Sequence, residues 1–106
     1  MSDAVDRVLE ALNAHDLEAF VACYTPDATI ENGYDRVAAS GHGGLRERFG
    51  PMFAEHPEIT VKAISRTVVG AFVVQEEEVT GRGEHERHVA VYLLEDGLIK
   101  RERLLA

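Results

Sequence analysis

Cysteine and positive charge are both scarce in this sequence, and each shortage excludes a class of protein. Cys23 is the only cysteine in 106 residues, so it has no partner for an internal disulfide or a cysteine-based zinc site. It lies in the apolar run 20–24, which favours a packed thiol over a nucleophile. The 11 Lys and Arg are outnumbered by 19 Asp and Glu, and the net charge is -8 with no basic stripe. This balance argues against nucleic acid or an anionic membrane as a partner.

Long apolar runs are also missing. No stretch reaches the roughly 18 apolar residues that a membrane span needs, and no charged segment followed by an apolar run marks a signal peptide. We therefore expect a cytoplasmic protein that does not insert into a membrane. A composition that is 45% hydrophobic and 28% charged is typical of a globular protein, and 106 residues predict one domain over 1–106.

Helical periodicity dominates the first half of the chain. Apolar residues at helical spacing predict a first helix over 3–13. Asp16 can cap a second helix, whose apolar face includes Phe20 and Tyr24 and which Pro26 should end. These two helices should form a hairpin.

A strand, a loop and a third helix should follow. β-branched residues predict a short strand over 28–32, and four glycines indicate a long loop over 33–44. A third helix is expected over 43–55, kinked or divided at Pro51. The helices therefore come before most of the predicted strands.

The second half of the chain alternates with a period of two. This pattern predicts four strands, over 58–69, 71–81, 86–95 and 98–105. Glycine-containing turns separate them, and the last turn contains Asp96-Gly97, a strong hairpin signal. Helices followed by an antiparallel meander are typical of an α+β domain.

Three segments carry a family resemblance: Ala11-Leu12-Asn13-Ala14-His15-Asp16-Leu17, Tyr24-Thr25-Pro26-Asp27-Ala28-Thr29-Ile30-Glu31-Asn32 and Ser40-Gly41-His42-Gly43-Gly44-Leu45-Arg46. They resemble the SnoaL-like and ketosteroid-isomerase-like branch of the nuclear transport factor 2 (NTF2-like) superfamily. The resemblance implies a cone, with three N-terminal helices packed on a strongly curved, mainly antiparallel sheet and a pocket at the open end. It also implies a homodimer formed through the outer face of the sheet. Its members include isomerases, hydrolases, cyclases and non-catalytic binding modules.

The residues of steroid isomerisation are missing from the matching positions. That chemistry uses a carboxylate base, a tyrosine and a protonated Asp. The base position falls on Asn32, the tyrosine near Val8 and the second donor near Val91. Asn32 cannot accept a proton at neutral pH, so we reject this mechanism for the chain.

Strand alternation predicts which side chains face the helices. In the strand over 86–95, the odd-numbered Val89, Val91 and Leu93 should face inward, and the even-numbered His88, Ala90, Tyr92 and Leu94 should form the dimer face. The family register turns Gln75 and Glu77 inward. The same register turns Arg101 and Arg103 inward.

These facings predict one polar cavity in the cone. It would be lined by Asn32, Gln75, Glu77, Arg101 and Arg103 and rimmed by Phe20, Tyr24 and Phe53. Glu77 would accept a proton, and Arg103 or Arg101 would hold developing negative charge or a ligand carboxylate. The alternatives are a closed Glu–Arg network that only stabilises the sheet, or a one-residue error in the facing.

The function that follows is that of a SnoaL-like small-molecule pocket protein. As an enzyme it would be a cofactor-free isomerase or hydrolase/hydratase acting on a small polar organic molecule. The alternative is a non-catalytic ligand-binding or dimerisation module. No metal site is expected, because His85 and His88 are three residues apart around a strand and should face opposite ways.

Overall fold

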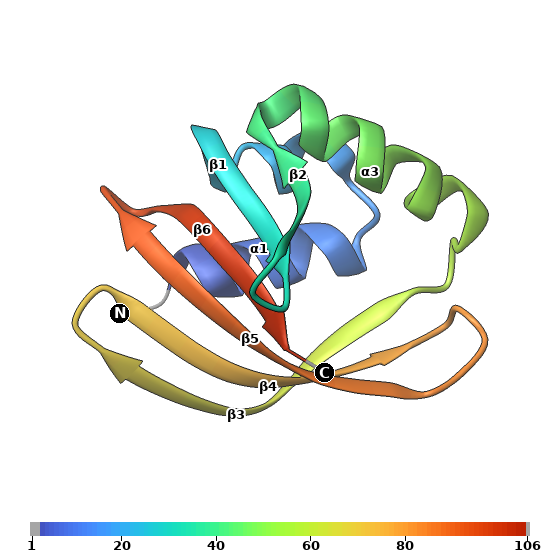
Figure 1. Ribbon diagram of the computed structural model, residues 1–106. Coiled ribbons are helices and arrows are strands. Elements are labelled where there is room, and N and C mark those ends of the chain that lie inside the picture. The colour runs from blue at the N-terminus through green and yellow to red at the C-terminus, as the bar shows by residue number, and fades with distance from the viewer. Residues whose placement is uncertain (1–2, 106) are drawn as a thin grey trace.

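The computed structural model describes residues 3–105 (Figure 1). The helices of this part are α1 (Asp3–Asn13), α2 (Leu17–Val21) and α3 (Gly41–Glu55). The strands are β1 (Tyr24–Asn32), β2 (Arg36–Ser40), β3 (Thr60–Val69), β4 (Phe72–Thr80), β5 (Glu86–Glu95) and β6 (Leu98–Leu105). The predicted helix over 3–13 and the four-strand meander are confirmed, with strand ends that differ by two residues at most.

The strands form one mixed sheet in the order β2-β1-β6-β5-β4-β3. β1 and β6 are parallel, and the other neighbouring pairs are antiparallel. Figure 1 shows the long strands β3, β4 and β5 curving beneath the helices. The predicted α+β cone, with three helices on a curved and mainly antiparallel sheet, is therefore confirmed. No helix within residues 3–105 is long and apolar enough to cross a membrane.

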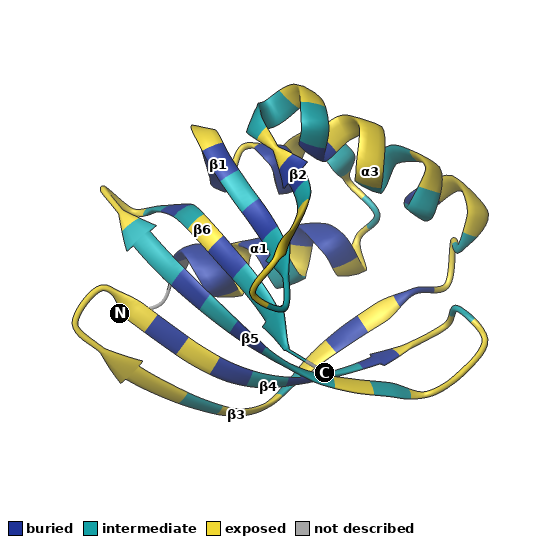
Figure 2. Cartoon of the chain, viewed as in Figure 1, coloured by how far each residue is buried: buried dark blue, intermediate teal, exposed yellow. Residues whose placement is uncertain are grey.

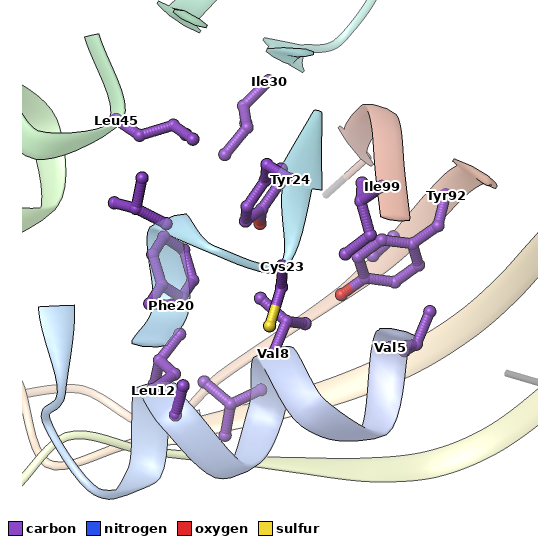
Figure 3. Close-up of a cluster of buried hydrophobic side chains, with 14 of the residues drawn as sticks. Val5, Val8, Leu12, Phe20, Cys23, Tyr24, Ile30, Leu45, Tyr92 and Ile99 are labelled. Atoms are coloured by element: carbon purple, nitrogen blue, oxygen red, sulfur yellow. The ribbon is translucent and has the colours of Figure 1, made fainter. Parts of the chain in front are cut away.

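The core lies between the helices and the concave face of the sheet. Val5, Val8 and Leu12 form the buried face of α1, as their helical spacing predicts. They point towards the aromatic rings of Phe20 and Tyr92 (Figure 3). Figure 2 shows the alternation of buried and exposed residues along β4, which marks the face that packs on this core.

The second predicted helix is too long. α2 ends at Val21, and Tyr24 begins β1, so Pro26 lies in a strand and does not end a helix. Pro26 is tolerated there because β1 pairs with β6 at Tyr24 and again from Thr29, with a register shift between them. Proline is found where the ladder is interrupted, since it has no N–H to donate.

The predicted loop over 33–44 is also wrong. It contains the edge strand β2, which pairs with β1, and α3 already begins at Gly41. The glycines Gly33 and Gly41 have positive φ values of 64° and 72°, so they form the turn before β2 and the junction after it. α3 runs without a break through Pro51, so the helix is not divided there.

Candidate functional site

β4 brings two polar side chains into the cone. Gln75 and Glu77 are 0% and 3% exposed, and they share the inner face with buried Val73 and Val79. The predicted inward facing of Gln75 and Glu77 is confirmed. Buried polar groups of this kind need hydrogen-bond partners, so their neighbours define the site.

The facing predicted for β5 is wrong. Gln75 pairs with Ala90 and Glu77 pairs with His88 across the antiparallel ladder. Residues directly opposite in such a ladder share a face, so His88, Ala90 and Tyr92 must face inward with Gln75 and Glu77. Ala90 and Tyr92 are 0% and 2% exposed. Val89, Val91 and Leu93 consequently lie on the outer face.

The facing predicted for Arg101 and Arg103 is wrong as well. Leu94 pairs with Ile99 and Leu93 pairs with Arg101, so Lys100 is an extra residue in β6. Such a bulge reverses the alternation beyond it. Ile99 and Glu102 are both buried, and the two arginines lie outside.

The arginines form a network on the outer face. Arg103 pairs with Glu31, and its guanidinium lies 4.8 Å from the centre of the Tyr34 ring. Arg101 Nε lies 3.6 Å from Glu31 Oε2. They do not share a cavity with Glu77, so neither arginine can hold charge on a ligand beside it.

The other predicted site residues are inside the cone or at its mouth. Phe20 and Tyr24 are buried and line an inner cavity of about 80 Å³. Asn32 is partly buried and lines an outer cleft of about 840 Å³. Phe53 packs against Phe20, with ring centres 5.8 Å apart.

The inner cavity and the outer cleft meet. Five residues line both spaces: Phe49, Met52, Arg82, His88 and Leu104. The inner cavity has an apolar wall from α1 and α3, and polar groups from the sheet face it: Tyr24, Glu77, His88, Tyr92 and Glu102. An apolar space with a few convergent polar groups is the usual form of a small-molecule site.

Glu77 is an acceptor of several hydrogen bonds. Its Oε1 lies 2.8 Å from His88 Nε2, and its Oε2 accepts from Gln75 Nε2 at 2.7 Å. The hydroxyl of Tyr92 also donates to Oε2. Three partners of this kind satisfy the hydrogen-bonding capacity of this buried carboxyl group.

Glu102 has a different environment. Its Oε1 accepts a hydrogen bond of 2.5 Å from the Tyr24 hydroxyl, and no hydrogen bond among the described residues involves Oε2. Burial raises the pKa of Glu102 to about 7, the bond from Tyr24 opposes this rise and the charge of Glu77 adds to it. Burial also raises the pKa values of Tyr24 and Tyr92 well above their usual range, so both remain hydroxyl donors.

Sequence reasoning did not identify Glu102, Tyr92 or His88 as site residues. For Tyr92 and His88 the signal was present, because the inward facing of Gln75 and Glu77 fixes that of their antiparallel partners. For Glu102 it was absent, because the alternation of 98–105 gives no sign of a bulge.

The fold and the site together define a class: an α+β cone that encloses a small apolar cavity with buried acidic and tyrosyl groups. The sequence matches the SnoaL-like domain family over residues 5–102. The chain belongs to this family, and the resemblance seen in its sequence is confirmed.

Solved structures show the same fold. An uncharacterised cystatin-fold protein from Novosphingobium aromaticivorans superposes with a TM-score of 0.89 at 26% identity, covering 99% of this chain and 97% of that one. A candidate polyketide cyclase from Sinorhizobium meliloti gives 0.84 at 20% identity, with 96% and 93% covered. A hypothetical protein from Catenulispora acidiphila with a ketosteroid isomerase-like fold, solved with trimethylamine, gives 0.80 at 12% identity, with 98% and 85% covered.

Proposed function

We propose that this protein binds a small, largely apolar organic molecule in the inner cavity and outer cleft and acts on it by acid–base chemistry without a cofactor. The observation that carries the proposal is the unlike state of two buried carboxyl groups in one cavity. Glu77 accepts three hydrogen bonds, whereas Glu102 accepts one and has a pKa of about 7. Pairs of titratable groups with opposed environments are the usual basis of acid–base assignments.

His88 takes the role of proton acceptor in this proposal. The Glu77 carboxylate accepts hydrogen bonds from Gln75 and Tyr92. Because a carboxylate has no donor, its contact with His88 requires the N–H to be on Nε2 of the imidazole. Nδ1 of the imidazole is then left as an acceptor. The side chain of His88 is 19% exposed and lies where the cavity meets the cleft. Glu77, expected from the sequence to be the base itself, instead orients His88.

Glu102 supplies the acid. Below neutral pH it holds a proton, and its Oε2 has no donor or acceptor among the described side chains. A neutral carboxyl group in an apolar site can donate a hydrogen bond or a proton to a ligand oxygen. Together with His88 this supports isomerisation, or the addition or removal of water.

The walls of the cavity and one solved relative support a ligand with an apolar carbon skeleton. The helical wall is apolar, as a cyclic or aliphatic carbon skeleton requires, and one solved relative is described as a candidate polyketide cyclase. A binding module without turnover would use the same cavity. The small exposure of Glu77, 3%, favours that second candidate.

A ligand screen separates these proposals. Thermal shifts would be recorded with lactones, steroids, polyketides and carboxylates, for the natural chain, Glu102→Gln, His88→Ala and Arg103→Ala. We expect a ligand that raises the melting temperature of the natural chain and of Arg103→Ala, with a smaller rise in the two cavity variants. Equal rises in all four proteins would place the ligand elsewhere. Each hit would then be followed by NMR for turnover, and binding without conversion would support the module.

We also propose a homodimer through the outer face of the sheet. Phe72 and Val74 of β4 are 48% and 39% exposed there, and they pair with Leu93 and Val91 of β5. Contiguous exposed apolar side chains of this kind are typical of protein contacts. A second copy of the chain would cover the patch, as the family resemblance implies.

A further inference from the structure

A line of polar side chains crosses three strands and ends at the proposed proton acceptor. Arg66 Nε on β3 donates to Gln75 Oε1 on β4 at 2.6 Å. Gln75 Nε2 donates to Glu77 Oε2 at 2.7 Å, and Glu77 Oε1 lies 2.8 Å from His88 Nε2 on β5. We propose that Arg66 is a positioning residue that sets the orientation of the Gln75 amide and, through Glu77, the tautomer of His88. The inference rests on the proposed function of His88.

The amide of Gln75 has one orientation that satisfies both of its neighbours. An arginine carries donors only, so the atom of Gln75 that faces Arg66 must be the carbonyl oxygen. The NH₂ group then faces Glu77. A rotation of the amide by half a turn would set donor against donor at Arg66 and acceptor against carboxylate at Glu77. Gln75 is 0% exposed, so water cannot compensate for the lost hydrogen bonds.

The orientation of the amide decides which atom of His88 carries the proton. With the NH₂ group on Glu77, the carboxylate stays ionised and its Oε1 accepts the N–H of His88 Nε2. With the carbonyl oxygen there instead, Glu77 loses a donor and faces a second acceptor, which opposes its ionised form. A proton taken from water onto Oε1 would be donated to His88 Nε2, and the neutral ring would then carry its own proton on Nδ1. The acceptor atom would be lost.

Arg66 also forms an ion pair with a residue of helix α1. Its guanidinium lies 2.8 Å from Asp6 Oδ1 on α1, and the Asp6 side chain is 54% exposed. An ion pair with an exposed partner contributes little to stability. The bond from Arg66 Nε to Gln75 uses a different nitrogen, so it does not need Asp6. Asp6 therefore provides a matched control, since changing it removes a contact of Arg66 without removing the donor that faces the amide.

The test observes the ring nitrogens of His88 in the ligand-free protein. Long-range ¹H–¹⁵N spectra would be recorded over a pH series for the natural chain, Arg66→Met, Arg66→Lys and Asp6→Asn, and the neutral ring would be compared. Arg66→Met keeps most of the apolar stem and removes the donor, whereas Arg66→Lys keeps a donor. We expect the Nε2–H tautomer in the natural chain, Arg66→Lys and Asp6→Asn. In Arg66→Met we expect the tautomer ratio to move towards Nδ1–H by about five- to tenfold, as loss of a hydrogen bond of ordinary strength implies.

An unchanged ratio in Arg66→Met would overturn the inference, as would an equal change in Asp6→Asn. Should Arg66→Met fail to fold, Gln75→Met removes the amide while Arg66 is kept, and it should move the same signals in the same direction. No change in this variant would also overturn the inference. The two proposals can fail separately, because the tautomer measurement needs no ligand. If the His88 tautomer depends on Arg66 but the ligand screen finds neither binding nor turnover, the proposed function is refuted and the positioning role stands.

Discussion

Glu77 and Glu102 line the same cavity, yet Glu77 accepts three hydrogen bonds and Glu102 accepts one. Each carboxyl group accepts a hydrogen bond from one tyrosine, and the pairing is not the one that strand neighbours would give. Tyr92 lies directly opposite Glu102 in the β5–β6 ladder, but its hydroxyl donates to Glu77, while Tyr24 from β1 serves Glu102. Glu77 thereby has three hydrogen-bond partners, whereas Glu102 is left able to hold a proton.

Stability should fall as the pH rises towards neutrality. The pKa of Glu102 is about 7 in the folded chain, whereas the ordinary value of 4.5 applies to the unfolded chain. Between pH 4.5 and pH 7 the unfolded chain has therefore lost the proton that the folded chain keeps. The folded state then binds more protons than the unfolded state, and the free energy of unfolding decreases with pH by roughly 3 kcal/mol in total. The stabilising contribution is complete below pH 4.5 and lost above pH 7. Urea denaturation at a series of pH values measures the slope.

Glu102→Gln is the control for this slope. A neutral amide of similar shape does not titrate, so the decrease between pH 4.5 and 7 should be flatter in the variant than in the natural chain. Parallel curves for the two proteins would show that other groups, such as the five histidines, cause the dependence.

Tyr92→Phe should destabilise the fold through Glu77. The variant keeps the ring and removes one of the three donors on a carboxylate that is 3% exposed. The free energy of unfolding should fall by about 1–3 kcal/mol. Tyr34→Phe removes a hydroxyl from a residue that is 77% exposed, and it should change stability by less than about 0.5 kcal/mol. Equal effects of the two substitutions in urea denaturation would contradict the role assigned to Tyr92.

Gly81→Ala should be among the most damaging substitutions of a surface turn. A Cβ at Gly81 would lie 2.1 Å from the backbone oxygen of Glu58, and Gly81 has a φ of 91°. Gly83 has a similar φ of 104°, but a Cβ there meets nothing within 4 Å. We expect Gly83→Ala to lower the free energy of unfolding by about 1 kcal/mol, from backbone strain alone. Gly81→Ala should lower it by at least about 2 kcal/mol more, because the added Cβ also clashes with the backbone of Glu58. Thermal unfolding of both variants would show the difference.

Leu93→Glu tests the proposed dimer. It places a charge in the outer apolar patch, opposite Phe72, and leaves the cavity on the other face untouched. Light scattering should give twice the chain mass for the natural protein and the single mass for the variant. A natural chain that is monomeric at micromolar concentration would refute the proposal.

The sequence predicted the elements whose signals are local. The period of 3.6 in α1 and the period of two from β3 to β6 survive in the structure, because one face of each packs on the core. The inward facing of Gln75 and Glu77 was predicted for the same reason. Half of the polar site could therefore be predicted from the sequence alone.

The rest of the site depended on irregular backbone. A single extra residue, Lys100, turns Glu102 inward and Arg101 outward, and nothing in the alternation of 98–105 marks it. β2 was missed because an edge strand of five residues with Gly33 before it and Gly41 after it has the composition of a loop. Both features depend on pairing with distant strands, which local periodicity does not contain.

The most direct test is a ¹³C NMR titration of the side-chain carboxyl carbons of Glu77 and Glu102, assigned with Glu77→Gln and Glu102→Gln. We predict that the Glu102 signal titrates near pH 7. A Glu102 signal that already shows the ionised form at pH 5 would contradict the assignment of Glu102 as the acid of the cavity.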